Sequence, residues 1–196
     1  TSDDNLLRPA MLERLVATLD AHPDAGVAFA DFTLIDDDGA VLGHSRVCPI
    51  ERIIYSNNVG ACFLYRRAVT EALGGYDTAL FGVEDYDFWL RAAARFRFVE
   101  LHEDLYLYRK HGGSLTSQRA ARIQALTAQI VQRSLPADLP PAERATILLD
   151  LALKSRSEWR VDLVARAFRA HPATVVARGY RILRWTAAVA RNRWTG

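Results

Sequence analysis

The apolar pattern of the chain changes at residues 135–141, where three prolines interrupt a run of helical periodicity. Before this break, short β-rich runs are mixed with helical segments, and after it only helical segments follow. We therefore expect an α/β domain over residues 1–133 and an all-helical segment over residues 134–196. The charge changes at the same place, from 14 basic and 18 acidic residues before it to 11 and 5 after it, so the second segment is basic.

Local signals predict the elements of both parts. Apolar residues on one face predict a helix that begins near Pro9 and ends near His22. The β-rich run from Val27 to Ile35, followed by the turn 36–39, predicts a hairpin with residues 40–47. The remaining predicted elements are a strand at 60–66, a short helix ending at Gly74-Gly75, a helix at 84–96, strands at 97–101 and 105–109, and helices at 115–133, 142–154, 157–170 and 173–193.

The composition is that of a globular protein, with 50% hydrophobic and 24% charged residues. The two cysteines, Cys48 and Cys62, lack partners at zinc-like spacing and favour a reducing, cytoplasmic environment. No apolar run reaches the length of a membrane span. Because the opening residues 1–5 read like the inside of a motif, we expect a further segment upstream of them.

The first motif whose side chains could take part in catalysis or metal binding is Ser2-Asp3-Asp4-Asn5. Two carboxylates followed by an amide provide hard oxygen ligands for a divalent cation such as Mn²⁺ or Mg²⁺. Such a cation stabilises the charge of a departing diphosphate without any proton transfer. The alternative interpretation is a polar turn or helix cap.

The second motif spans residues 81–91 and places Glu84, Asp85 and Asp87 in the first turn of a predicted helix. The structural explanation is that acids there interact with the helix dipole, for about 0.3–1 kcal/mol each. The functional explanation is that one carboxylate accepts a proton from an attacking hydroxyl. Trp89, one turn after Asp85, offers either an apolar platform for a sugar ring or a core side chain.

The third motif is the basic, glycine-containing loop Tyr108–Ser114. Arg109 and Lys110 can neutralise a diphosphate, and His111 can ligate a metal. The alternative is a surface turn at the end of a strand.

Taken together and in order, these motifs resemble the C-terminal half of the family 2 glycosyltransferases, which have the GT-A fold. The resemblance covers roughly residues 1–116 and implies a partial GT-A domain without its N-terminal βαβ half. Further segments that carry it are Asn58-Val59-Gly60-Ala61, Phe63-Leu64-Tyr65-Arg66-Arg67, Gly74-Gly75-Tyr76-Asp77 and Ser114-Leu115-Thr116.

The resemblance implies roles for particular residues. Asp85 matches the catalytic base, and Glu84 supports it. The implied metal ligands are Asp3, Asp4 and His111. The implied donor-binding residues are Asp3, Asn5, Arg109 and Lys110, and the implied acceptor-binding residues are Trp89, Arg66 and Gly60.

The implied activity is hexosyl transfer from a nucleotide sugar, for instance a UDP-sugar, to a hydroxyl of a saccharide or lipid-linked acceptor. The resemblance implies inversion at the anomeric carbon and a bacterial setting, in cell-surface polysaccharide or glycolipid synthesis. Because the family's nucleotide-binding half normally precedes the acidic motif, we expect the 196 residues alone to be weakly active or inactive. The alternatives are a truncated, non-catalytic interaction module and a nucleotidyltransferase.

The basic C-terminal helix contains tryptophans, and no acidic residue occurs from Leu163 to the end. A basic amphipathic helix can lie on an anionic membrane, which would place a cytoplasmic protein peripherally at the inner face of the membrane. The alternative is a helix that packs on the catalytic domain, residues 1–133, and keeps its arginines in water. No base-stacking module is recognisable, so we expect no nucleic-acid partner.

Overall fold

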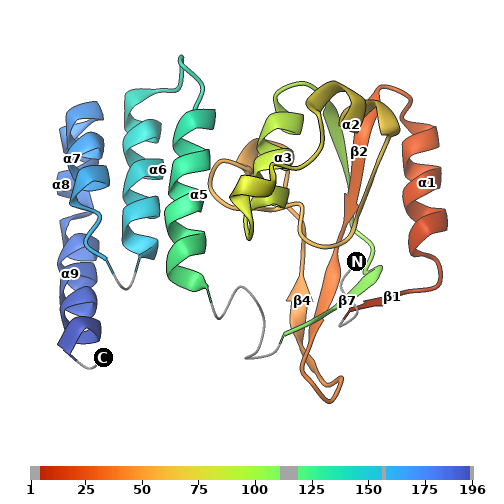
Figure 1. The fold of residues 1–196 in the computed structure, drawn as a ribbon, viewed down its shortest axis with the longest axis horizontal. Coiled ribbons are helices and arrows are strands. Elements are labelled where there is room, and N and C mark those ends of the chain that lie inside the picture. Colours follow the sequence, from red (N-terminus) through yellow and green to blue (C-terminus); the bar gives the residue numbers. More distant parts are fainter. Residues whose placement is uncertain (1–4, 111–118, 156–157, 195–196) are drawn as a thin grey trace. The chain divides into compact units, whose positions relative to one another are not determined.

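The computed structural model describes residues 5–110, 119–155 and 158–194. The chain divides into an α/β unit, Thr1–Gln118, and a helical unit, Arg119–Gly196 (Figure 1). None of the described helices combines the length and the hydropathy that a membrane span requires.

The α/β unit contains two small mixed sheets. The first has the strand order β1-β7-β3-β4, and the second has the order β5-β2-β6. The strands are β1 (Leu6–Leu7), β2 (Ala25–Ala30), β3 (Phe32–Ile35), β4 (Val41–Ser45), β5 (Phe63–Tyr65), β6 (Arg97–Leu101) and β7 (Tyr106–Arg109). The helices are α1 (Met11–Ala21), α2 (Arg67–Leu73) and α3 (Glu84–Ala93), with 3₁₀ turns η1 (Ile50–Arg52) and η2 (Thr78–Leu80).

The expected hairpin is confirmed by the antiparallel pairing of β3 with β4, but the strand before it is not continuous. It divides at Asp31, so that β2 and β3 belong to different sheets. The backbone N–H of Asp31 donates to the Leu101 carbonyl, and the Asp31 carbonyl accepts from the Leu105 N–H. The division therefore depends on partners some seventy positions away, which a local pattern does not encode.

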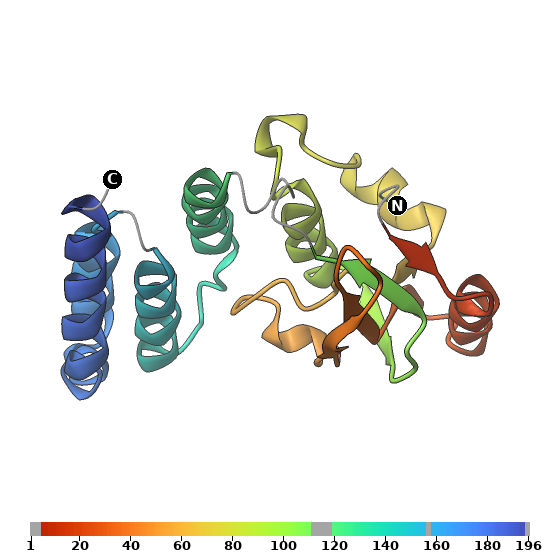
Figure 2. The ribbon, with the colours of Figure 1, turned by 90° about the horizontal axis from the view of Figure 1, so that it is seen from below.

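Strand β2 is buried on both faces, and alternate residues serve different layers. Ala28 and Ala30 pack with the buried face of α1. Phe29 lies on the opposite face, where its ring meets Phe98 edge-on. Figure 2 shows α1 (red) and α3 (yellow-green) on opposite sides of the strands. The unit is thus a three-layer α/β arrangement in which α3 covers one face.

The helical unit is built around α6 (Pro141–Lys154), which packs against the helices on either side of it. The other helices are α5 (Ala120–Ser134), α7 (Val161–Ala170), α8 (Pro172–Ala177) and α9 (Gly179–Trp194). The unit begins at Arg119 rather than at the expected residue 134, because α5 packs on α6 and buries Ala128, Ile130 and Val131.

The expected single helix at 173–193 is two helices, α8 and α9, separated at Arg178. Arg178 lies at the end of α8 with φ −105° and ψ 12°, and Gly179 follows it. Glycine is a poor helix former, which allows the chain to turn there.

Helix α9 packs on the helical unit through Trp185 and Val189, which are buried. The Trp185 Nε1–H donates to the Ser155 carbonyl at 2.7 Å. On the outer face, Tyr180 and Leu183 are 73% and 69% exposed. The inner face of the basic helix thus packs on the helical unit, whereas the expected partner was the α/β domain, and membrane contact by its outer face stays a prediction.

Candidate active site

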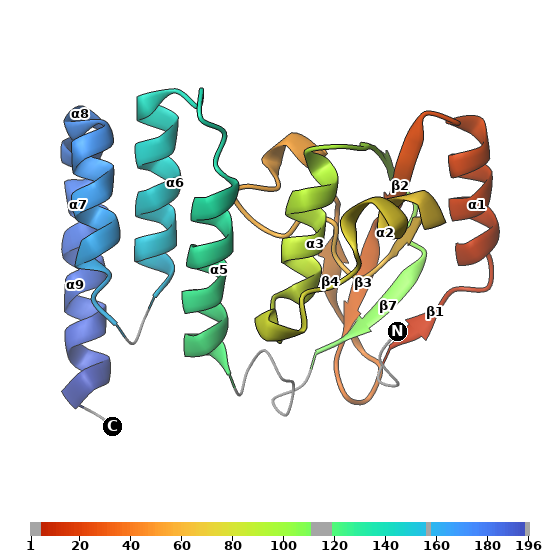
Figure 3. The same ribbon diagram turned by 45° about the horizontal axis from the view of Figure 1, so that its top comes forward.

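The topology places the first turn of α3 at the edge of the β5-β2-β6 sheet where β2 and β6 end. Strand β6 is parallel to β2, and α3 leads into β6 through a short connection at residues 94–96. Helix α3 runs back along the strands (Figure 3), so its N-terminal end lies at the edge where β2 and β6 end. Ligands of open α/β sheets commonly bind beyond the carboxyl ends of the strands.

Asp85 lies in this first turn and is half-buried. Its Oδ1 accepts a hydrogen bond from the Tyr86 backbone N–H at 2.7 Å. Its Oδ2 accepts one from the Asn57 side-chain amide at 3.1 Å. A carboxylate has about four lone-pair positions, so two donors leave room for a further hydroxyl.

The environment of Asp85 favours proton acceptance. Burial raises the pKa of Asp85 above its ordinary value, and the negative charge of Glu84 acts in the same direction. The hydrogen bonds from Tyr86 and Asn57 act against this rise. A carboxylate with a raised pKa is a stronger base once ionised, which suits general-base chemistry near neutral pH.

The two neighbouring acids of the motif have structural partners. The Glu84 carboxylate accepts from the backbone N–H of Gly82, which closes the start of the helix. Asp87 is 1% exposed and pairs with Arg91 Nε at 2.9 Å. Arg91 also donates to the carbonyls of Leu73 and Gly75, so this pair fixes the end of α2. Asp85 is therefore the acid of the motif best placed to meet a substrate.

Trp89 does not offer the platform that the motif suggested. Its side chain is 0% exposed and packs among aromatic rings of the sheet and of its own helix. The nearest ring is Phe63, edge-on with centroids 4.7 Å apart. The prediction that Trp89 binds the acceptor is therefore wrong, and the alternative, that Trp89 is a core side chain, is correct.

Arg66 is also wrongly assigned to the acceptor. Its guanidinium donates to the carbonyls of Ala25 and Leu19, at 3.0 and 2.6 Å. Because β5 runs antiparallel to β2, Arg66 lies at the edge where β2 begins. That edge is opposite to the one that carries Asp85, so Arg66 joins α1 to the sheet instead of contacting a substrate.

Gly60 lies in the loop before β5, at the same edge as Asp85. Its φ of +69° is in the left-handed region, which L side chains rarely adopt. A Cβ there would stand 2.5 Å from the Phe32 ring. The structure thus explains the glycine by backbone conformation and close packing, and its predicted role with the acceptor stays a prediction.

Three of the predicted donor-binding residues, Asn5, Arg109 and Lys110, lie close together at the end of β7, and the fourth, Asp3, lies outside the described residues. The Asn5 Oδ1 accepts from the Arg109 backbone N–H at 2.8 Å. The Arg109 guanidinium donates to the carbonyls of Asp36 and Asp37 in the β3–β4 turn. Diphosphate binding by Arg109 is therefore not supported in this conformation. The side chain of Lys110 is exposed, so its predicted role remains open.

Three predicted metal ligands, Asp3, Asp4 and His111, lie outside the described residues. Within the described ranges, no three His, Cys, Asp or Glu side chains gather in a way that could hold a metal ion. Asn5 is described, but its amide oxygen is engaged with β7. The metal site therefore stays a prediction, and it depends on Asp3, Asp4 and His111.

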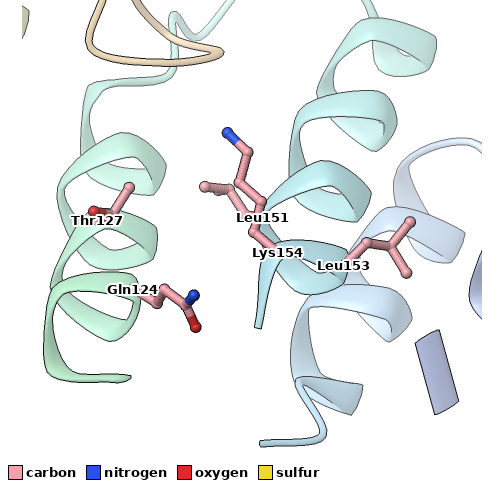
Figure 4. A pocket seen from close by; sticks show the side chains of 5 residues that line it. All are labelled: Gln124, Thr127, Leu151, Leu153 and Lys154. Carbon is pink, nitrogen blue, oxygen red and sulfur yellow. The ribbon is translucent and has the colours of Figure 1, made fainter. Parts of the chain in front are cut away.

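The helical unit contains a separate cavity of about 490 Å³ between α5 and α6. Figure 4 shows the residues that line it, Gln124 and Thr127 on α5 and Leu151, Leu153 and Lys154 on α6. None of the predicted site residues that the structure describes lines this cavity. We therefore place the candidate site in the α/β unit, around Asp85.

Sequence reasoning missed Asn57, which holds the Asp85 carboxylate from a loop 28 positions away. The neighbouring Asn58-Val59-Gly60-Ala61 segment drew attention to the loop but not to this side chain. Only the folded arrangement brings the two residues together.

Comparison with known proteins adds a relative but no family. No family model matches the chain. The chain is 27% identical over 124 residues, 61% of its length, to a protein of Sinorhizobium fredii (strain NBRC 101917 / NGR234) named "Uncharacterized protein y4gI". The matched region spans 14% of that relative's length.

Proposed function

We propose that the protein is a glycosyltransferase of GT-A type that transfers a sugar from a nucleotide sugar to an acceptor hydroxyl. The observation that supports this most is the Asp85 carboxylate, half-buried and held by two donors beyond the carboxyl ends of β2 and β6. In this role the acceptor hydroxyl gives its proton to Asp85. Its oxygen forms a bond to the anomeric carbon while the bond to the nucleotide diphosphate breaks, with inversion.

The diphosphate leaves with the electron pair of the broken bond. A bound Mn²⁺ or Mg²⁺ would stabilise its charge, and Asp3, Asp4 and His111 are the residues proposed to hold the ion. The proposed donor is a UDP-sugar, and the proposed acceptor is a saccharide or lipid-linked saccharide of cell-surface synthesis. A cytoplasmic location, at the inner face of the membrane for a lipid-linked acceptor, belongs to the same proposal.

The test uses the complete gene product with a panel of UDP-, GDP- and dTDP-sugars and Mn²⁺, and measures release of nucleoside diphosphate. We expect Asp85→Asn to lower kcat by about 10²–10⁴-fold, because general-base catalysis contributes that much. Donor affinity should be largely unchanged. The control is Glu71→Gln, which removes a charge from an exposed position of α2 in the same unit.

Other outcomes select the alternatives. Turnover that survives Asp85→Asn removes Asp85 from the role of base. Release of pyrophosphate from a nucleoside triphosphate and a sugar phosphate would indicate a nucleotidyltransferase. Absence of transfer from every donor would favour a non-catalytic interaction module.

A further inference from the structure

The segment between η1 and β5, residues 53–62, is joined to the first turn of α3 by two hydrogen bonds. The buried Tyr86 hydroxyl donates to the Ile53 carbonyl at 2.6 Å. The Asn57 amide donates to Asp85 Oδ2 at 3.1 Å. These contacts join an irregular segment to the turn that carries the candidate base.

The same segment is held to the chain that precedes η1. The Asn58 side-chain amide donates to the carbonyls of Cys48 and Pro49, at 2.9 and 2.8 Å. Asn57 and Asn58 are thus adjacent asparagines with different partners: Asn58 contacts only backbone in these bonds, whereas Asn57 contacts the reactive carboxylate. Asn58 therefore holds the loop together, whereas Asn57 acts at the candidate active site.

We propose that Asn57 is a positioning residue that orients the Asp85 carboxylate toward the acceptor hydroxyl. This inference rests on the proposed function. With the Tyr86 N–H on Oδ1 and the Asn57 amide on Oδ2, rotation of the carboxylate about its χ2 torsion would break one of the two bonds. The remaining lone pairs then point in fixed directions, and small displacements of a catalytic group can lower rates substantially.

Asn57 also stabilises the ionised form of Asp85, because a hydrogen bond to the charged form lowers the pKa of a carboxyl. Removing the amide should therefore raise the pKa of Asp85 further. Among the described residues, the charged group that raises the pKa of Asp85 is Glu84 on the same turn, while the Asp85 charge in turn raises the pKa of the nearby Tyr76 phenol. Both remain in place when Asn57 is replaced.

The first measurement is independent of turnover. In the 196-residue chain, carboxyl-detected ¹³C NMR follows the titration of Asp85 in the wild type, in Asn57→Leu and in the control Asn58→Ala. We expect a higher Asp85 pKa in Asn57→Leu only. Equal titration curves in all three proteins would overturn the proposal.

The second measurement is the pH dependence of kcat in the complete gene product. Asn57→Leu should lower kcat by about tenfold to a hundredfold and move the acid limb of the profile to higher pH, with little change in acceptor KM. If Asp85→Asn abolishes transfer while Asn57→Leu keeps the wild-type profile, the positioning role is wrong and the proposed function stands. If Asp85→Asn retains transfer, the proposed base itself is wrong.

Discussion

The two units differ in how they use charge. The α/β unit has 18 acidic and 11 basic residues, whereas the helical unit has 5 and 14. In the α/β unit, Asp87 is buried and Asp85 half-buried, both in the first turn of one helix. In the helical unit, Asp150 is 29% exposed and pairs with Arg178 and Arg181, which are 29% and 54% exposed.

This difference supports the proposed placement of the site in the α/β unit. Burying ionisable groups costs free energy unless they are paired, and such groups cluster at functional sites. The α/β unit accepts that cost at α3, whereas the helical unit buries apolar residues almost exclusively, with Ser155 the buried polar residue among those described. We therefore interpret the helical unit as a packed structural or docking element, and the α/β unit as the unit with the reactive site.

The largest expected effect on stability concerns the buried pair of the α/β unit. Arg91→Leu deprives the nearly inaccessible Asp87 of its guanidinium partner and removes the bonds to Leu73 and Gly75. Breaking a fully buried pair from one side costs about 3–5 kcal/mol, and because the Arg91 side chain is 31% exposed we expect a loss at the lower end of this range, of about 3 kcal/mol. Urea unfolding followed by circular dichroism should show this loss.

The matched change in the helical unit is Arg181→Leu, which removes an exposed partner of Asp150. Exposed pairs contribute about 0–1 kcal/mol, so the unfolding curve should hardly move. Similar losses for the two variants would contradict the contrast between the units.

An intermediate effect separates the two buried tryptophans. The Trp185 indole donates to the Ser155 carbonyl, whereas the Trp89 indole N–H is buried without a partner among the described residues. Both Trp→Phe changes lose similar volume, but Trp185→Phe also leaves a buried carbonyl without its donor, for about 1–3 kcal/mol. In urea unfolding, we expect Trp185→Phe to lower the free energy of unfolding more than Trp89→Phe. The reverse order would contradict a stabilising role for the hydrogen bond from Trp185 to Ser155.

The smallest effect tests the outer face of α9. If that face lies on a membrane, the whole chain should bind phosphatidylglycerol vesicles in sedimentation assays, and Arg184→Gln should weaken binding about fivefold, because one basic residue contributes about 1 kcal/mol at such a surface. Arg14→Gln, in the α/β unit, is the charge-matched control. Equal binding by both variants, or none by the wild type, would leave α9 as a packing helix alone.

Much of the fold could be predicted because it follows local periodicity. The β3–β4 hairpin, the strand at 97–101 and the helix that begins at Glu84 all have short-range signals. The division at Asp31 could not be predicted, since it depends on hydrogen bonds to Leu101 and Leu105 across the sheet. The unit boundary was misplaced because α5 has the same periodicity whether it packs on strands or on α6.

The site was predictable in part. The sequence placed Asp85 at the start of a helix, which is where it lies. It could not decide whether Trp89 faces a ligand or the core, because Tyr86 to Leu90 are all buried and no single apolar face marks the interior. Arg66 and Arg109 look available in the sequence, yet backbone carbonyls from distant segments engage both guanidinium groups.

Helix α3 combines two attachments with different consequences. Its middle is anchored by Trp89 in the aromatic core, while its first turn meets a segment, residues 53–62, that contains no regular strand or helix. A chain that keeps Asn57 and the Ile53 contact can therefore vary the other residues of that segment without losing the hydrogen bonds that join it to the first turn of α3. Under the proposed function, such changes would alter acceptor preference while Asp85 keeps its place as the proposed base.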